Sequence, residues 1–239
     1  MYKEHYVFES PKDENAKIWR YMDFTKFLSL LDKSALFFTR VDKLGDPFEG
    51  TCPEKVINFW EKKLGIEYPK GFYEHLSKFT AVNCWHLNEY ESAAMWKMYL
   101  KSNEGIAVQS TFKRLKDSLI DKEHDILIGK VKYINYGKLV EPTKVFTNPV
   151  IYKRKIFRHE QELRAVIKKL PKRGFSPRSK KTIEDGIYVL VDVDILIDKI
   201  YLAPISPVWQ FELLKSVMGK YQLDKDVIQS SMDEKPLLK

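Results

Sequence analysis

The stretch FTAVNCWHLNEYESAAMWKMYLKSNEGIAVQST, residues 79–111, predicts the centre of the fold as a strand, a helix and a second strand. Its first seven residues have the β-branched and aromatic content of a short buried strand. Asn88 is in position to cap a helix over residues 89–100, and Glu91 has the capping-box position three residues later. After a polar break that contains a glycine, a second strand is predicted over residues 106–108.

The predicted helix is apolar around most of its circumference, which is the pattern of a helix that is packed on several sides. We therefore expect it to be buried in the middle of the domain, with Met95 and Trp96 nearly inaccessible. Core packing does not require the polar and aromatic residues at the entrance of the helix. These are Asn83, Cys84, Trp85, His86, Glu91 and Ser92. We interpret Cys84 as a small buried residue, because the sequence places no distant base beside it.

Strands and helices alternate along the rest of the chain without regular βαβ repetition. This order predicts an α+β fold with a mixed, mostly antiparallel sheet and the buried central helix. No internal repeat or long linker interrupts the pattern, so residues 18–230 are expected to form a single domain. Residues 1–17 are predicted to be a polar N-terminal segment, and residues 231–239 a C-terminal tail.

The composition is typical of a globular protein that folds without disulfides. The chain has 239 residues, of which 44% are hydrophobic, and a chain of this length can bury a sizeable core. No run approaches the roughly 18 apolar residues that span a bilayer, and the N-terminus lacks the apolar centre of a signal peptide. The two cysteines, Cys52 and Cys84, fit a reducing compartment and predict a cytoplasmic protein. The five histidines are scattered, so we expect no metal site.

The chain carries a net charge of +8, much of it in two runs at residues 153–158 and 168–181. Such an excess is typical of contact with nucleic acid or another phosphate-rich partner. A solvated basic loop is the alternative, which Pro171, Gly174 and Pro177 favour for the second run. The residues predicted to make a weak nucleic-acid contact are Lys153, Arg154, Lys168, Lys169, Lys172 and Arg173.

Arg20 lies between Trp19 and Tyr21 on a predicted strand over residues 18–22. Side chains alternate along a strand, so Arg20 faces away from these two aromatic neighbours. Arginine is seldom buried without a partner. One interpretation is an exposed or structurally paired arginine, and the other is an anchor for a phosphate or carboxylate group.

The loop that contains Asp46-Pro47-Phe48-Glu49 supplies a second candidate group. Asp46 is expected to cap a turn, and Phe48 to fill the core. Glu49 is then left to pair with an arginine, either Arg20 or Arg164.

The third candidate group is HEQELR at residues 159–164. In a strand, Glu160, Glu162 and Arg164 share one face, and the two carboxylates lie about 7 Å apart. They repel each other unless a cation or a substrate hydroxyl lies nearby. Two interpretations have equal weight: a salt-bridged ladder with Arg158 and Arg164, or a carboxylate that holds ribose hydroxyls. The sequence contains no glycine-rich phosphate loop, G-x-S-x-G elbow or kinase signature.

Three blocks of the chain resemble a large, mostly bacterial and phage family known as a domain of unknown function. The blocks are residues 18–50, which end in GDPFEG, residues 83–111, which contain NCWHLNEYESAAMWKMY and GIAVQST, and KRKIFRHEQELRAVI at residues 153–167. Members of that family have an R-Y strand, a D-P-F-E loop, an A/L-M-W helix and an E-x-E-x-R block. The resemblance covers most of the chain, but it implies no particular reaction.

The order of blocks is also similar to the ADP-ribosyltransferase superfamily. Its members have an Arg or His on the first strand, a Ser-Thr-Ser-like strand before a helix, and a late Glu, often in an E-x-E pair. Arg20 matches the first role, Asn83-Cys84-Trp85 the second, and Glu160 and Glu162 the third, although this chain lacks the serines of the middle motif.

That resemblance implies NAD as a substrate, cleaved through an oxocarbenium-like state that Glu162 would stabilise. Arg20 would hold the phosphates, and Tyr21 or Trp85 would stack on nicotinamide. The residues expected to contact the ligand are Tyr21, Glu49, Trp85, Ser92 and Arg164. The competing hypothesis is a non-enzymatic binding module for nucleic acid. A phosphodiesterase or nuclease ranks last, because the chain has no His or Asp cluster.

Overall fold

The computed structural model describes residues 1–65, 67–69, 71–99, 104–169 and 182–233. Contacts group the chain into two compact units, each assembled from three segments. Unit 1 consists of Met1–Ser10, Phe37–Cys84 and Lys122–Tyr188, and unit 2 of Pro11–Leu36, Trp85–Asp121 and Val189–Lys239. That residues 18–230 form one domain remains a prediction.

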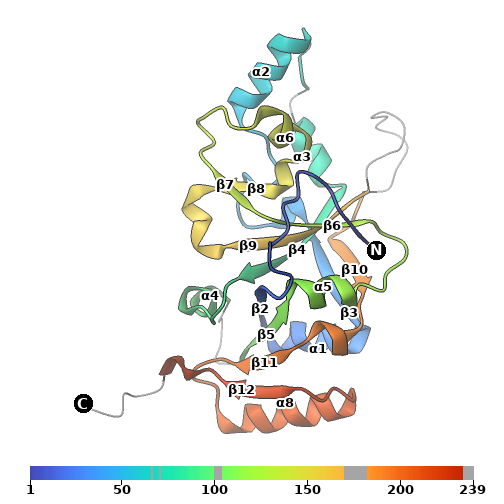
Figure 1. Ribbon diagram of the computed structural model, residues 1–239, viewed down its shortest axis with the longest axis vertical. Helices are drawn as coiled ribbons and strands as arrows, with labels where there is room; N and C mark the ends of the chain where they lie inside the picture. The colour runs from blue at the N-terminus through green and yellow to red at the C-terminus, as the bar shows by residue number, and fades with distance from the viewer. Residues whose placement is uncertain (66, 70, 100–103, 170–181, 234–239) are drawn as a thin grey trace, which may run out of the picture. The chain divides into compact units, whose positions relative to one another are not determined.

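All three segments of unit 1 contribute strands (Figure 1). β1 (Tyr2–Lys3) pairs parallel with β6 (Ile126–Lys130), which pairs antiparallel with β9 (Glu162–Lys168). β3 (Ala35–Arg40) pairs with β10 (Gly186–Leu190) and, antiparallel, with β4 (Thr80–Leu87), and each of these three strands has residues in both units. β7 (Lys132–Ile134) and β8 (Tyr152–Arg154) form a separate parallel pair.

Most helices of unit 1 contribute residues to a hydrophobic core that also includes Val7 and Phe8. The backbone of Phe8 passes Gly129 of β6 so closely that a Cβ there would lie 2.7 Å from the Phe8 Cα. The polar composition of residues 1–17 does not reveal that this segment enters a core. The helices are α2 (Glu54–Leu64), α3 (Phe72–Ser77) and α6 (Pro142–Thr147), with 3₁₀ helices η1 (Val41–Lys43), η2 (Pro149–Ile151) and η3 (Lys155–Glu160).

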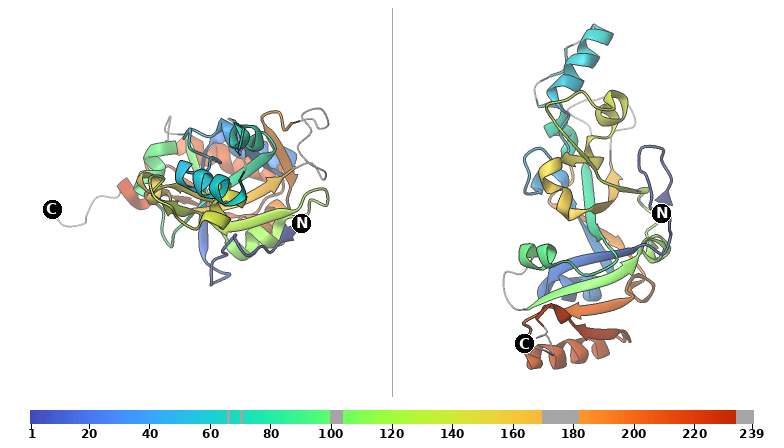
Figure 2. Two further views of the ribbon diagram at one scale, coloured as in Figure 1. Left: turned by 90° about the horizontal axis from the view of Figure 1, so that it is seen from above. Right: turned by 60° about the vertical axis from the view of Figure 1, so that its left-hand side comes forward.

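Unit 2 is built on two long antiparallel strands, β2 (Lys17–Asp23) and β5 (Gly105–Thr111), which lie side by side in Figure 2. β5 pairs antiparallel with β11 (Lys199–Leu202), and β11 pairs parallel with β12 (Asp226–Gln229). The last residues of β4 pair antiparallel with the first residues of β2. Antiparallel pairs outnumber parallel ones among the described strands, which confirms the predicted α+β fold with a mixed, mostly antiparallel sheet.

Side-chain caps fix the first residues of the helices that follow strands in unit 2. The Asp23 carboxylate accepts a hydrogen bond from the Lys26 amide at 2.8 Å, and the Thr111 hydroxyl accepts one from the Arg114 amide at 3.1 Å. Each satisfies an amide that has no partner within its helix. The helices are α1 (Phe24–Lys33), α4 (Ala93–Tyr99), α5 (Phe112–Ser118), α7 (Val193–Leu196), α8 (Val208–Lys220) and the 3₁₀ helix η4 (Ser231–Asp233).

The central helix, α4, is shorter and more exposed than its composition predicts. Met95 and Trp96 are buried as expected, against Trp19 and Tyr21 of β2. Every other residue of α4 is exposed, so the expectation of packing on several sides is wrong. The helix covers strands with one face only, and apolar composition alone does not distinguish one face from several.

The predicted cap of that helix is also wrong. The Asn88 carbonyl accepts a hydrogen bond from the Trp19 indole nitrogen at 2.8 Å, and its side chain accepts one from the Glu89 amide. These bonds hold the chain outside a helix for several more residues. Ser92 precedes the helix instead, and its hydroxyl accepts a hydrogen bond from the Met95 amide at 3.4 Å. None of the helices within the described residues has the length and apolarity needed to cross a membrane.

Candidate functional site

A buried group of charged side chains lies in unit 1, centred on Arg164 of β9. The Arg164 side chain is 1% exposed, and all five of its N–H donors have acceptors. Nε and one terminal nitrogen donate to the Glu162 carboxylate at 2.8 and 3.1 Å. The terminal nitrogens also donate to both Glu49 oxygens at 2.8 and 2.9 Å, and to the Val150 carbonyl at 2.8 Å. The guanidinium therefore holds two carboxylates in fixed positions.

Lys153 of β8 is the second cation of this group. Its ammonium nitrogen lies 2.7 Å from Glu162, 2.5 Å from Glu160 and 3.2 Å from Glu49. Three carboxylates thus surround two cations, and the ionised group has a net charge of −1. Lys153 is predicted from the sequence to contact nucleic acid, because no local pattern shows that a lysine in a basic run turns inward.

The loop after η1 brings Glu49 to the group, in the way that the D-P-F-E pattern predicts. The Asp46 carboxylate accepts a hydrogen bond from the Phe48 amide at 3.1 Å, and the Asp46 carbonyl accepts one from the Glu49 amide at 3.0 Å. Arg154 donates to Asp46 at 2.7 Å and fixes the turn from outside. Of the two predicted partners of Glu49, Arg164 is confirmed by these contacts. Phe48 is 40% exposed, so the prediction that it fills the core is wrong.

Glu160 and Glu162 reach the group from different local structures. Glu162 begins β9, whereas Glu160 ends η3, and Gln161 between them has a left-handed conformation with φ of 39°. Glu160 is therefore not on the strand ladder that the alternating pattern predicts. Lys153 nevertheless draws the two carboxylates together. The Glu162 side chain is 5% exposed, and that of Glu160 is 13% exposed.

The surroundings push the pKa values of the two carboxyl groups apart. Burial alone would raise the pKa of Glu162, but Arg164 outweighs burial and holds it below its usual range. Burial, followed by the hydrogen bond with Glu162, raises the pKa of Glu160 to about 7. At neutral pH the Glu162 carboxylate is therefore ionised, whereas the Glu160 carboxyl group is protonated in part of the molecules.

Two further residues contact this group and were not predicted to do so. The Tyr133 hydroxyl accepts a hydrogen bond from the Glu162 amide at 2.9 Å and fixes the start of β9. Cys84 of β4 lies beside Glu162, and burial followed by this carboxylate raises the pKa of its thiol. A thiol with a raised pKa is a poor nucleophile, which agrees with the interpretation of Cys84 as a packing residue.

The other predicted site residues, Arg20, Tyr21, Trp85 and Ser92, belong to unit 2. The Arg20 guanidinium carbon lies 6.0 Å from the centroid of the Trp85 ring. The Tyr21 hydroxyl accepts a hydrogen bond from the Ser92 amide at 2.8 Å, which ties β2 to the start of α4. Tyr21 and Trp85 are 4% and 1% exposed, so protein atoms cover their rings. Each unit therefore brings together its own set of predicted residues.

Three of the six residues predicted to contact nucleic acid have other partners. Lys153 and Arg154 are in ion pairs, and Lys168 donates to the Asn148 side chain. Lys169 is exposed, whereas Lys172 and Arg173 lie outside the described residues. Across the described ranges, no group of His, Cys, Asp and Glu side chains is arranged to hold a metal ion.

Neither the family models nor the curated proteins contain a match to this chain. Solved structures of DarT from Thermus sp. 2.9 do match it. The complex of DarT with NAD+ matches with 7% identity over 92% of this chain and 98% of that chain, at a TM-score of 0.44. The carba-NAD+ complex matches with 8% identity over 91% and 96%, at a TM-score of 0.42.

The complex of DarT with ADP-ribosylated single-stranded DNA matches with 7% identity over 93% of this chain and 97% of that chain, at a TM-score of 0.42. These matches span nearly the whole length of both chains. At such scores the likeness is too remote to assign a role to any residue.

Proposed function

We propose that the protein is an ADP-ribosyltransferase-like enzyme that cleaves the N-glycosidic bond of NAD and transfers ADP-ribose to an acceptor. The observation that carries this proposal is the Glu160–Glu162 pair, whose pKa values are pushed in opposite directions. Two adjacent carboxyl groups with different protonation states are typical of acid–base chemistry at a glycosidic bond. The similar order of sequence blocks in the ADP-ribosyltransferase superfamily supports the same class of reaction.

Glu162 would stabilise the positive charge that develops on the ribose. When the bond from C1′ to nicotinamide breaks, the electron pair leaves with nicotinamide, and C1′ becomes oxocarbenium-like. A carboxylate that Arg164 keeps ionised and fixed is already oriented for this charge, so little reorganisation is needed during the reaction. Mutations that remove one such electrostatic contact typically lower kcat by about 10²–10³-fold.

Glu160 would act as the general base for the acceptor. A base works best when its pKa lies near the working pH, and the pKa of Glu160 is about 7. As the acceptor oxygen or nitrogen forms its bond to C1′, its proton passes to the Glu160 carboxylate. Glu160 is the more exposed of the two carboxyl groups, which gives the acceptor access from solvent.

Within unit 2, Arg20 is the candidate anchor for a phosphate group, because a guanidinium fork matches phosphate oxygens. Ser92, Tyr21 and Trp85 would then hold β2 and α4 in position around it, through the hydrogen bond and the ring contact described above. Tyr21 and Trp85 would thus support the site through packing, whereas the sequence predicts that one of them stacks on nicotinamide.

The test uses NAD that carries separate labels on the nicotinamide ring and on the adenylate. Wild type and Glu162→Gln are each incubated with this NAD and with protein and nucleic-acid acceptors. Wild type should release nicotinamide and transfer the adenylate label, and Glu162→Gln should be slower by about 10²-fold or more. Glu160→Gln should lose transfer to the acceptor more than it loses nicotinamide release.

Glu54→Gln is the matched control, because it makes the same chemical change at an exposed residue of unit 1. It should behave as wild type. No nicotinamide release by wild type, or equal rates for wild type and Glu162→Gln, would contradict the proposal. Circular dichroism at the assay temperature separates a lost reaction from a lost fold.

A further inference from the structure

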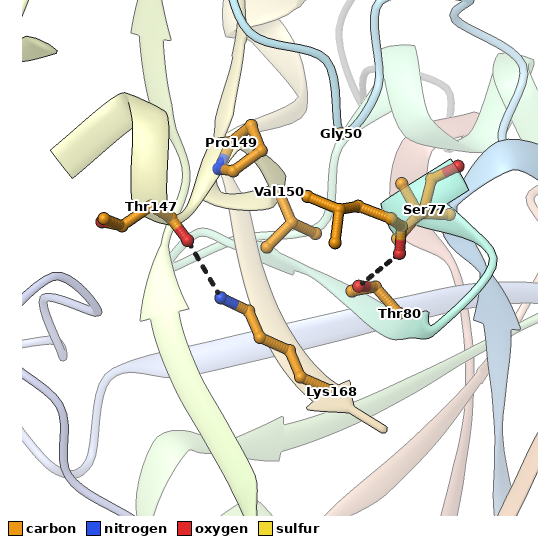
Figure 3. A pocket seen from close by; sticks show the side chains of 9 residues that line it. Gly50, Ser77, Thr80, Thr147, Pro149, Val150 and Lys168 are labelled. Carbon is orange, nitrogen blue, oxygen red and sulfur yellow. Dashed lines mark hydrogen bonds between the residues drawn. The ribbon is translucent and has the colours of Figure 1, made fainter. Parts of the chain in front are cut away.

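A small cavity in unit 1 lies beside Lys168, at the end of β9 opposite to Glu162. Its volume is about 40 Å³. A water molecule needs about 10–15 Å³ by this measure, so the cavity has room for about three. Figure 3 shows Lys168 and Thr147 on one side and Ser77 and Thr80 on the other. The lining residues are Val41, Gly50, Leu76, Ser77, Thr80, Thr147, Pro149, Val150 and Lys168, all from unit 1.

The Lys168 ammonium group has neutral partners only. It donates to the Asn148 side chain and to the Thr147 carbonyl, the latter at 3.5 Å. Within the described ranges, no carboxylate forms an ion pair with it. Burial lowers the pKa of Lys168 to about 8, as expected for a cation that has lost water without gaining a counter-ion. Burial, followed by Lys168, also lowers the pKa of His5.

We propose that the cavity beside Lys168 binds a small oxyanion of the phosphate class. Lys168 is half-buried and has no ion-pair partner within the described ranges, and an anion in this cavity would supply the missing negative charge. The Asn148 side-chain oxygen and the Thr147 carbonyl accept hydrogen bonds from two N–H groups of the ammonium and leave the third N–H for the occupant. The oxygens of such an ion would lie in the space that about three water molecules could fill.

Two hydroxyl groups on the opposite wall supply further donors. The Ser77 hydroxyl donates to the Glu74 carbonyl at 2.7 Å, and the Thr80 hydroxyl donates to the Leu76 carbonyl at 3.3 Å. The longer bond of Thr80 is the weaker one, so its hydroxyl turns toward a bound anion at a small cost. Lys168 and Thr80 would thus hold the ion from two sides. This site is separate from the Glu160–Glu162 pair and does not depend on the proposed function.

The test is calorimetric titration with sulfate, which has the shape of phosphate and does not titrate near neutral pH. At pH 8, a bound anion raises the pKa of Lys168, so binding takes up about half a proton. The uptake is read from the heats in two buffers that differ in ionisation enthalpy, with sodium gluconate holding the ionic strength constant. Wild type should bind sulfate with this uptake, and Lys168→Met should bind it about tenfold more weakly or worse, without uptake.

Lys169→Met is the matched control, because it removes the same charge from the exposed neighbour and should bind as wild type. Equal affinities of Lys168→Met and wild type, or sulfate binding by wild type without proton uptake, would overturn the proposal. The wild-type uptake decides the question even if Lys168→Met is unstable. Inorganic phosphate and AMP then identify the source: tighter binding of AMP indicates the phosphate of a nucleotide, and binding of inorganic phosphate alone indicates a free ion.

Discussion

Replacing Arg164 by Met removes the centre of the buried charged group and should destabilise the protein strongly. The substitution keeps a long side chain but removes five hydrogen bonds. The Glu49 and Glu162 side chains, 2% and 5% exposed, are left with Lys153 as their shared cation. Removing one partner of a buried ion pair typically costs about 3–5 kcal/mol, because it leaves a buried charge uncompensated.

The assay is urea unfolding followed by far-ultraviolet circular dichroism at pH 7. With a slope of about 3 kcal/mol per molar urea, the midpoint should fall by roughly 1–2 M. Arg114→Met is the control: the side chains of its pair with Asp198 are 37% and 33% exposed, and such pairs contribute about 1 kcal/mol or less. The difference between Arg164→Met and wild type should shrink from pH 7 to pH 5, as the unpaired carboxylates gain protons. Equal losses for the two arginine variants would refute the reasoning.

Three further substitutions test other parts of the structure by the same unfolding assay. The pKa of Glu160 is raised to about 7, so the folded protein holds this proton more tightly than the unfolded chain does. Wild type should therefore lose stability relative to Glu160→Gln as the pH rises from 5 to 8. Parallel pH profiles of the two proteins would disprove this. Gly50→Ala should lower the free energy of unfolding by about 1–3 kcal/mol, because Gly50 has φ of +68° and a Cβ there would lie 2.6 Å from Val41 Cγ1. Gly45→Ala is the control and should be nearly neutral, because a Cβ at Gly45 meets no atom within 4 Å. Gln210→Met should stabilise by about 1 kcal/mol, because both polar atoms of this buried amide lack hydrogen-bond partners within the described residues; a loss of stability would show that the amide is satisfied.

Local patterns predicted the elements of this protein well where one signal dominated. The strand predicted over residues 18–22 is β2, which runs from Lys17 to Asp23. The helix predicted over residues 89–100 failed at its start because the Trp19 indole binds the Asn88 carbonyl, a contact between residues that are distant in sequence. Its exposure was missed because apolar composition does not report how many faces of a helix are covered.

The candidate site was predictable in part for the same reason. A buried arginine needs carboxylates, so the pairing of Glu49 with Arg164 followed from residue types alone, as one of two alternatives. Lys153 joins the group only because η3 returns Glu160 and Glu162 to the end of β8, and no spacing in the sequence shows this turn. The cavity beside Lys168 depends on residues from four separate stretches of the chain, which no linear pattern brings together.

The central claim of the proposed function is that Glu162 lies at an NAD site, and hydrogen exchange of Glu162→Gln with and without NAD tests it most directly. This variant should bind NAD without consuming it, so a stable complex can be measured by mass spectrometry of proteolytic peptides. The account predicts slower exchange with NAD in peptides from η3 and the start of β9, residues 155–164. Unchanged exchange in these peptides would contradict an NAD site at Glu162.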